Sequence, residues 1–387
     1  MTVDQHGASA IMRTQIERGL GIPRDLYLCE ELFEREVDAI FDRTWLPAGH
    51  VSQLSAPGRY LTVESGRESI VVARTAEGDL AAFHNVCRHR GARLVDPGCG
   101  SARRLVCPYH QWTYRMDGSL QGAPKMPADF DSARHPLPRV HVATWQGLVF
   151  VSLAADPGPS PQDLLGVGEP LIAPFDLAGA TVAHSVTYDV AANWKLVWEN
   201  AQECYHCTAN HPELLKAFDV TGAGSAQADP GDLHRSADNR VQYARFTLKA
   251  GAASLTVDGR PASAKPMGEF AHGREPYTVA LHLKPTFAVV CSPDYAVVLR
   301  DRPISVDRTE VTMQWLVRGD AEADVDYDLD NLIKVWDRTN RQDWALCERT
   351  QLGVRSRSFE PGPLSDDESS VAAFHRAYAE MLAGAGL

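Results

Sequence analysis

Two pairs of possible metal ligands, each made of one Cys and one His, stand near each other in the first third of the chain. They are Cys87 with His89 and Cys107 with His110, so the donors follow one another in the order Cys, His, Cys, His. Thiolate sulfur and imidazole nitrogen are both ligands of transition metals. One donor of each type from each pair suits a cluster of two irons, with the thiolates on one iron and the imidazoles on the other.

A cluster held in this way is a Rieske 2Fe-2S centre, which carries single electrons. Its two imidazoles raise the reduction potential to roughly −150 to +300 mV, above that of a plant-type cluster with four Cys ligands. The alternative is a structural zinc ion, which also accepts two Cys and two His. Zinc sites usually pair Cys with Cys and His with His, whereas each pair here is mixed. The motif therefore favours the 2Fe-2S cluster over zinc.

A second set of possible ligands, His206 and His211, lies further along the chain in a segment that ends at Pro212. Their spacing does not match one face of a regular helix, so we expect the helix to end or bulge between them. Pro212 supports an ending, because helical backbone is disfavoured immediately before proline. Two such histidines would by themselves more often be ordinary core or surface side chains. The cluster motif upstream favours a second metal site.

Two imidazoles and one carboxylate form the facial triad that binds non-haem Fe(II) and leaves positions open for dioxygen. Asp343 is the candidate carboxylate, because it lies on the apolar stripe of a predicted helix, where an unpaired carboxylate would be costly to bury. The alternative is an Asp that pairs with an Arg or faces solvent. Cys204 and Cys207 flank His206 and could suggest zinc, but we expect both to be small buried side chains.

The composition is that of a folded protein with two domains. The chain has 387 residues, of which 44% are apolar and 23% charged. Its net charge of −12 argues against binding of nucleic acid phosphates. Because the sequence contains neither a signal peptide nor a membrane-spanning stretch, we expect a cytoplasmic protein that does not bind membranes. In that compartment the eight cysteines should be ligands or buried thiols rather than disulfides.

Short strand-like runs dominate the first part of the chain, and both ligand pairs fall at strand ends or in loops. These runs cover residues 69–74, 80–87, 112–116 and 148–153. An amphipathic helix at 30–42 precedes the domain that they form, and a linker rich in Pro and Gly follows at 154–161. We expect an N-terminal helical segment at 1–37 that packs on the catalytic domain, an all-β cluster domain at 38–155 and the catalytic domain at 156–387.

Strand patterns resume after the linker and predict an antiparallel sheet, because consecutive strands are not separated by helices. The predicted strands are 183–190, 241–248, 277–284, 286–291, 295–300 and 310–317, with turns at Arg302-Pro303 and Val306-Asp307. Two helices close the chain, one over 327–352 and one after the capping box of Ser365 and Glu368. The fold class is therefore α+β.

The two metal motifs together resemble the oxygenase (alpha) subunits of Rieske non-haem iron oxygenases. The downstream motif comprises Asn193-Trp-Lys, Glu199-Asn200, Glu203-x-Tyr-His206 and His211-Pro212. The resemblance covers nearly the whole chain, with both motifs in the expected order. It implies a Rieske 2Fe-2S domain followed by a helix-grip-type antiparallel sheet covered by helices. It also implies that His206, His211 and Asp343 bind a mononuclear Fe(II).

The resemblance implies partners as well as ligands. A separate reductase would pass electrons from NAD(P)H to the cluster, and O2 would be the co-substrate. Subunits of this family form a homotrimer or a dimer of trimers, in which each cluster lies next to the iron of a neighbouring subunit. A carboxylate relays electrons between the two sites, and Glu203 occupies that position. Most members have Asp there, whereas Glu is similar to the subgroup that acts on quaternary ammonium compounds such as glycine betaine, stachydrine and carnitine.

The expected reaction is hydroxylation of an N-methyl group of such a compound, which yields formaldehyde and the demethylated amine. Aromatic faces attract quaternary ammonium groups. The aromatic residues available for this are Tyr205, Phe270, Tyr277, Phe287, Tyr295 and Trp315, although core packing is the more common role of such side chains. One alternative is an alpha subunit that hydroxylates aromatic rings as a mono- or dioxygenase. Another is an electron carrier of the Rieske ferredoxin type, for which the second motif would be coincidence.

Overall fold

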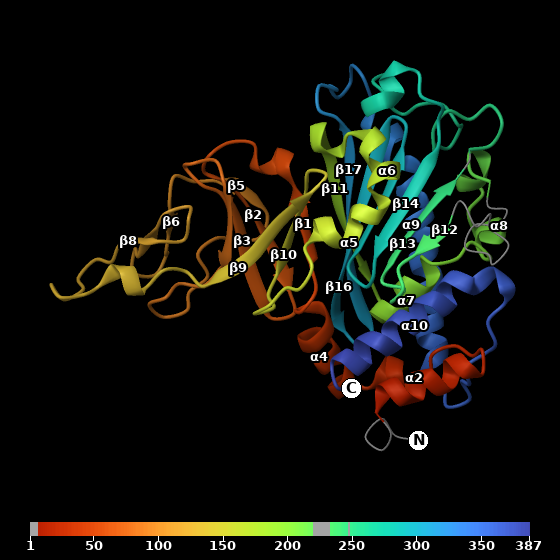
Figure 1. Ribbon diagram of the computed structural model, residues 1–387, viewed down its shortest axis with the longest axis horizontal. Coiled ribbons are helices and arrows are strands. Elements are labelled where there is room, and N and C mark those ends of the chain that lie inside the picture. The colour runs from red at the N-terminus through yellow and green to blue at the C-terminus, as the bar shows by residue number, and fades with distance from the viewer. Residues whose placement is uncertain (1–6, 220–232, 247) are drawn as a thin grey trace. The chain divides into compact units, whose positions relative to one another are not determined.

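The computed structural model describes three stretches of chain, residues 7–219, 233–246 and 248–387 (Figure 1). The chain divides into two compact units. Asp42–Leu164 form one unit, which we call the β unit. Met1–Phe41 and Leu165–Leu387 form the other, which we call the α+β unit. None of the helices described in these stretches is long and apolar enough to cross a membrane.

The β unit is built on a seven-stranded antiparallel sheet with the order β1-β10-β9-β4-β3-β2-β5, beside which β6, β7 and β8 form a small second sheet. The strands are Leu46–His50 (β1), Arg59–Ser65 (β2), Glu68–Arg74 (β3), Leu80–His84 (β4), Cys99–Ser101 (β5), Leu105–Val106 (β6), Thr113–Tyr114 (β7), Leu120–Gly122 (β8), Arg139–Trp145 (β9) and Leu148–Ser152 (β10). Successive side chains of a strand point to opposite faces. Val71 and Ala73 accordingly pack in one apolar cluster, and Ile70 and Val72 in another.

The α+β unit contains a second seven-stranded antiparallel sheet, with the order β11-β17-β16-β15-β14-β13-β12. Its strands are Ala180–Val190 (β11), Leu233–Arg235 (β12), Val241–Phe246 (β13), Thr278–Leu283 (β14), Phe287–Ser292 (β15), Tyr295–Ser305 (β16) and Arg308–Arg318 (β17). On β14, Val279, Leu281 and Leu283 are fully buried, whereas Ala280 and His282 on the opposite face are only half-buried. That second face of the sheet lines the cavity described below.

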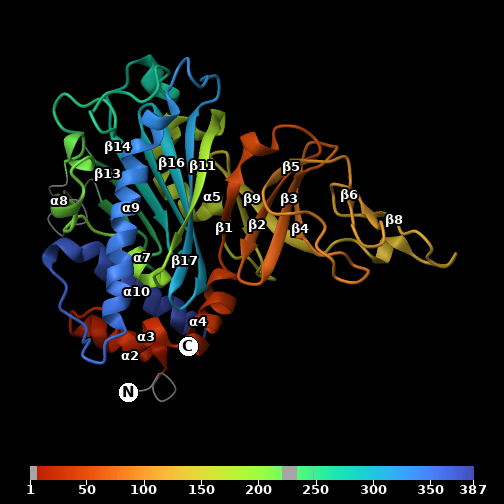
Figure 2. The same cartoon turned by 180° about the vertical axis from the view of Figure 1, so that it is seen from behind.

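Helices cover and flank this sheet. They are α2 (Ala8–Glu17), α3 (Arg24–Leu28), α4 (Glu30–Glu36), α6 (Glu169–Ile172), α7 (Trp194–Asn200), α8 (Cys207–Asn210), α9 (Leu329–Val354) and α10 (Ser369–Gly384), while α5 (Pro161–Leu165) lies at the boundary of the units. Figure 2 shows α9 running along one face of the sheet, where Trp344 packs near Tyr188 of β11. The Asp328 side chain caps the start of α9 by accepting from the N–H of Asn331 (2.8 Å).

A buried ion pair joins α4 to α7. Glu36 and Lys195 are 0% and 1% exposed, and Lys195 Nζ lies 2.8 and 3.0 Å from the two carboxylate oxygens. The same carboxylate accepts from the indole N–H of Trp194 (3.0 Å) and from the hydroxyl of Tyr378 on α10. Burial lowers the pKa of Lys195, and the charge of Glu36 opposes that shift. One carboxylate therefore holds three helices together.

The predicted strands and terminal helices are present, with several differences in detail. The strand pattern at 295–300 continues as β16 to Ser305, so the turn predicted at Arg302-Pro303 is wrong. Pro303 is tolerated because the register with β17 shifts between Pro303 and Ser305, where a missing N–H does little harm. The helix predicted at 30–42 consists of two parts, the α-helix α4 and a π-helical turn that follows it at Val37–Phe41. Several short strands, β12 among them, carry too little pattern to be predicted.

Replacement of Lys195 by Met should destabilise the protein by about 3–5 kcal/mol, because it leaves the carboxylate of Glu36 buried without its counter-charge. The double variant Glu36→Gln/Lys195→Met should recover most of that loss, since both charges are then absent. Free energies of unfolding from denaturant titrations would measure both effects. A single variant as stable as the wild type would contradict this account of the ion pair.

Candidate metal sites

Two loops of the β unit carry the first set of predicted ligands and share one backbone pattern. In each loop the N–H of the Cys, Cys87 or Cys107, donates to the carbonyl five residues later (2.8 Å in both). The carbonyl of the same Cys accepts from the N–H four residues later (3.0 Å in both). That fourth position is left-handed in both loops, with φ 76° at Gly91 and 60° at Gln111. The loops thus present their Cys and His side chains in matching ways.

The thiols and imidazoles of these loops segregate by type. Cys87 and Cys107 are buried in an apolar cluster of the β unit, whereas His89 is exposed and His110 half-buried. The two imidazole rings lie together, with centroids 4.6 Å apart, and His89 stacks on the indole of Trp112 (4.9 Å). The structure therefore brings the four residues together with sulfur on the inner side and nitrogen on the outer side.

The protonation of these side chains fits a buried metal group. Burial raises the pKa of the Cys87 thiol, so a metal rather than the surroundings must stabilise its thiolate. Desolvation, with His89 and Arg90 nearby, lowers the pKa of His110 and keeps its ring neutral. Its Nδ1 is buried and has no hydrogen-bond partner in the described part of the chain. An orphaned ring nitrogen beside buried thiols suits a cluster that binds thiolates on one iron and imidazoles on the other.

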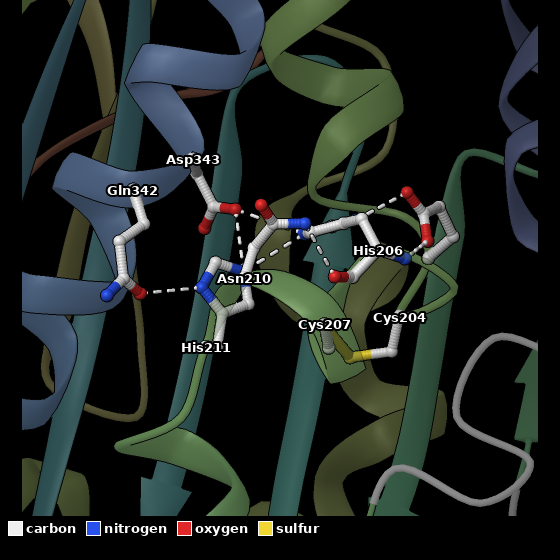
Figure 3. The surroundings of a disulfide bond; sticks show 8 residues. Cys204, His206, Cys207, Asn210, His211, Gln342 and Asp343 are labelled. Carbon is white, nitrogen blue, oxygen red and sulfur yellow. Dashed lines mark hydrogen bonds and ion pairs between the residues drawn. A yellow bond between two sulfur atoms is a disulfide. The ribbon is translucent and has the colours of Figure 1, made fainter.

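The second set of ligands converges in the α+β unit from two separate segments. His206 precedes α8 and His211 follows it, because this helix is a single turn that ends at Asn210, as the spacing of the two histidines predicts. Asp343 comes from the middle of α9 and faces the two rings (Figure 3). The Nε2 atoms of His206 and His211 lie 3.0 Å apart. Asp343 Oδ1 lies 3.1 Å from the first and 2.9 Å from the second.

The size of this triangle fits a single metal ion. Metal–nitrogen bonds of about 2.1 Å at right angles would place two ligand atoms about 3.0 Å apart. All three edges of the triangle formed by His206, His211 and Asp343 have this length. Three ligands on one face leave the opposite positions of the ion open, which is the arrangement of the facial triad.

Hydrogen bonds on the far side of each ring select the nitrogen that faces the triangle. His206 Nδ1 donates to Glu203 Oε1 (2.5 Å), and the backbone N–H of His206 donates to Glu203 Oε2 (3.1 Å). His211 Nδ1 donates to Gln342 Oε1 (2.8 Å), whose amide donates in turn to Glu213 (3.3 Å). With Nδ1 protonated, Nε2 of each ring is free to bind a metal.

The charges of the site also favour a cation. Burial opposes protonation of His206, but the hydrogen bonds to Asp343 and Glu203 outweigh it and raise its pKa to about 9. Burial likewise opposes ionisation of Asp343, yet the two imidazoles lower the pKa of this carboxyl. The alternative of an Asp343 that pairs with Arg or faces solvent is therefore wrong, because its partners are the two histidines. In the absence of metal, protons take the place of the cation.

Cys204 and Cys207 form a disulfide, with Cα atoms 4.8 Å apart (Figure 3). The prediction that the cysteines are ligands or buried thiols is wrong for this pair, because the turn between α7 and α8 brings the two side chains together around His206. The bond also removes Cys207 as a ligand, although its sulfur lies within 4.8 Å of the donor atoms of His206 and His211. Asp343 remains as the third donor.

An apolar cavity adjoins the triangle within the α+β unit. It is bounded by the segment after α7, by α9 and by the sheet. The aromatic residues that line it are Phe218, Phe246, Trp336 and Trp344. None of the aromatic residues named from sequence lines it: Phe287, Tyr295 and Trp315 are fully buried in the core, and Tyr205 is exposed. Trp336 could have been identified, because it shares the helical stripe of Asp343 two turns away.

Comparisons with known proteins identify both domains. Residues 44–146 match the Rieske [2Fe-2S] domain, and residues 177–384 match the catalytic domain of ring hydroxylating alpha subunits. The chain is 40% identical over 378 residues to the glycine betaine monooxygenase oxygenase subunit of Pseudomonas aeruginosa (strain UCBPP-PA14), covering 92% of this chain and 88% of that protein.

Solved structures share the fold over most of the chain. The quaternary ammonium Rieske monooxygenase CntA in complex with L-carnitine is 25% identical, with a TM-score of 0.74 and coverage of 94% of this chain and 95% of that one. Naphthalene 1,2-dioxygenase from Rhodococcus sp. is 19% identical, with a TM-score of 0.75 and coverage of 97% and 98%. The second likeness concerns the fold alone.

Each of the two sets of donor residues lies inside a matched domain, one Rieske and one catalytic. A structural zinc site and a simple electron carrier are therefore both excluded. This chain belongs to the Rieske non-haem iron oxygenases, as an oxygenase (alpha) subunit with a Rieske 2Fe-2S cluster and a mononuclear iron.

Proposed function

We propose that this chain is the terminal oxygenase of a system that hydroxylates an N-methyl group of a quaternary ammonium compound of the glycine betaine type. The observation that carries the proposal is the 40% identity to a glycine betaine monooxygenase oxygenase subunit over most of both chains. A ring hydroxylase with an aromatic substrate is the rival, since naphthalene 1,2-dioxygenase has the same fold. Glu203 argues against a ring hydroxylase, because most members of the family have Asp at that position.

The ligand roles follow from the geometry of the two sites. Cys87 and Cys107 would bind one iron of the cluster and His89 and His110 the other. His206, His211 and Asp343 would bind the mononuclear iron. When bound, the cluster supplies single electrons, and the mononuclear iron activates O2 for insertion of one oxygen atom into a C–H bond.

Glu203 is proposed to relay electrons between the sites. Its carboxylate oxygen Oε1 lies 2.5 Å from Nδ1 of His206, and its side chain is 13% exposed. Glu203 thus contacts a proposed iron ligand and remains partly accessible from outside. We propose that it also meets a cluster histidine of a neighbouring subunit in a homotrimer or a dimer of trimers. Inter-subunit electron transfer is described for a quaternary ammonium Rieske monooxygenase of the same fold, which supports this arrangement.

The cavity would hold the substrate away from bulk water. Phe218, Phe246, Trp336 and Trp344 present aromatic surface to an ammonium group, whose attraction to such faces is worth about 0.5–2 kcal/mol each. Hydroxylation of one N-methyl group produces an N-hydroxymethyl compound. Breaking its C–N bond, with loss of the hydroxyl proton, releases formaldehyde and the demethylated amine.

The proposed division of labour assigns electron entry to residues 38–155 and the oxidation to residues 156–387, with 1–37 packed on the catalytic part. A separate NAD(P)H-dependent reductase would serve as partner. We propose a cytoplasmic location, where NAD(P)H is available.

The substrate is tested by supplying the iron-loaded protein with a compatible reductase, NADH and glycine betaine. Formaldehyde should appear in proportion to the NADH consumed, and dimethylglycine should accumulate. Benzoate, as an aromatic control, should yield no hydroxylated product. Hydroxylation of the ring without formaldehyde from any betaine would overturn the proposal in favour of the rival.

Replacement of Asp343 by Ala should abolish binding of the mononuclear iron while the cluster remains. The iron content should fall from three to two atoms per chain, the counts implied by a cluster with and without one further ion, with unchanged acid-labile sulfide. Asp337→Ala on the same helix is the matched control, because Asp337 pairs with Arg341 rather than with the histidines. Full iron content in the Asp343 variant would exclude its role as a ligand.

Iron affinity of the metal-free protein should rise with pH up to about 9. Because the pKa of His206 is raised to about 9, its ring is protonated at lower pH and iron must displace a proton. The apparent affinity should therefore change about tenfold per pH unit between pH 7 and 9. Anaerobic competition between the apoprotein and a chelator of known affinity would measure it. An affinity independent of pH would contradict the protonated state.

The Glu203→Ala variant should retain both metal centres yet turn over about 10- to 100-fold more slowly, the usual cost of losing an outer partner of a metal ligand. A relay role predicts in addition that the chemically reduced cluster is reoxidised slowly by O2 and substrate. Glu348→Gln, which changes an acid outside the cavity, is the control. Normal turnover of Glu203→Ala would exclude the relay.

A further inference from the structure

The cavity beside the iron ligands is lined by two kinds of polar side chain. One kind is the carboxylate, contributed by Asp343 and Glu203 beside the histidines. Neutral side chains form a second group, which we call the polar end: Gln242 pairs with His282 across neighbouring strands and donates to Ser370. The sheet also contributes small residues to the lining, which leave room for a compact ligand. These are Ala244, Ala280 and Ala288 on neighbouring strands.

Two cations stand behind the polar end. Lys284 follows His282 by two residues on the same face of the chain, and its side chain is completely buried. Its Nζ donates to the carbonyl of Asn239 (3.1 Å) and to Gln242 Oε1 (3.2 Å). Arg235 donates to the same Gln242 oxygen (3.2 Å) and to Ser370 Oγ (2.8 Å).

These two cations lack a carboxylate at ion-pair distance. Among the residues that the structure describes, no carboxylate forms an ion pair with Lys284 or Arg235. A buried ammonium without a counter-charge is costly. Burial, with Arg235 and Arg376 nearby, lowers the pKa of Lys284 to about 7, and the more distant charge of Asp238 offsets only a small part of this shift. An incoming anion would remove this cost, so the end of the cavity is prepared for negative charge.

The side chains in front of the cations present hydrogen-bond donors. Gln242 Oε1 accepts from both Lys284 and Arg235, so the amide nitrogen of Gln242 is directed to the cavity side, where it donates to Ser370 Oγ (3.3 Å). The amide of Gln202 donates to His282 Nδ1 (3.3 Å), which places the proton of the neutral ring on Nε2. Burial lowers the pKa of His282 to about 3, so the ring stays neutral.

We propose that this end of the cavity binds the carboxylate of a zwitterionic substrate through His282 and Gln242, with Lys284 and Arg235 supplying the positive charge. The ammonium end of the substrate then points toward Asp343 and Glu203, where its methyl groups meet the iron site. The inference rests on the proposed function and narrows it. The enzyme should select quaternary ammonium acids over quaternary ammonium ions that lack a carboxylate.

The sharpest test is Gln242→Glu in the iron-loaded protein. The new carboxylate occupies the position that already accepts from Lys284 and Arg235, so it pairs with both cations, leaves the fold intact and repels a second anion. Dissociation constants are measured by calorimetry for glycine betaine and for tetramethylammonium. The constant for glycine betaine should rise about 10- to 100-fold. The constant for tetramethylammonium, which has no carboxylate, should change less than about threefold.

His282→Leu is the second variant and removes a donor without adding charge. It should also raise the dissociation constant of glycine betaine about tenfold or more and leave that of tetramethylammonium unchanged. Thr312→Val, which makes the same kind of change on β17 outside the cavity, is the control and should alter neither constant. If either variant, Gln242→Glu or His282→Leu, weakens the binding of both compounds equally or of neither, the proposal that this end binds a carboxylate is overturned.

The two levels of inference fail in different ways. A wild-type enzyme that demethylates glycine betaine, with variants that bind it normally, overturns only the carboxylate end. A wild-type enzyme that neither binds nor demethylates any betaine overturns the proposed function, and the carboxylate end with it.

Discussion

The buried ion pair between Glu36 and Lys195 is the interaction on which the α+β unit depends. The carboxylate of Glu36 neutralises Lys195 at the start of α7 and accepts from Trp194 and Tyr378, so α4, α7 and α10 meet at one charged point. A charge buried this deeply tolerates only a narrow range of arrangements, because separation of the partners leaves an uncompensated ion. The position of α7 is therefore well defined, and the segment that follows it supplies Glu203 and His206.

The catalytic site shows how a few hydrogen bonds can prepare a metal site. Glu203 and Gln342 each hold one ring proton, and the opposite nitrogens of His206 and His211 then face Asp343. Removal of either outer partner would allow the ring to turn or to carry its proton on the wrong nitrogen. The relay role that we propose for Glu203 would connect orientation of the ligand and delivery of electrons through one side chain.

In the β unit, backbone hydrogen bonds rather than side chains position the candidate ligands. Two loops with the same hydrogen-bond pattern bury Cys87 and Cys107 in an apolar cluster and bring together an exposed His89 and a half-buried His110. The segregation by ligand type makes the two irons of a Rieske cluster chemically different. Burial of the sulfur side protects it from solvent, whereas the imidazole side is the more exposed of the two.

The sequence by itself determined both sets of candidate ligands, because a metal requires particular donor atoms, and the spacing of the Cys and His residues along the chain indicates them. The single-turn helix between His206 and His211 follows from local rules, as do the strand and helix patterns. Only the tertiary structure decided which distant residues meet. The disulfide between Cys204 and Cys207 depends on a turn, and the pairing of Lys284 and Arg235 with Gln242 depends on the register of neighbouring strands. Such contacts are set by packing of the whole unit, so no local pattern encodes them.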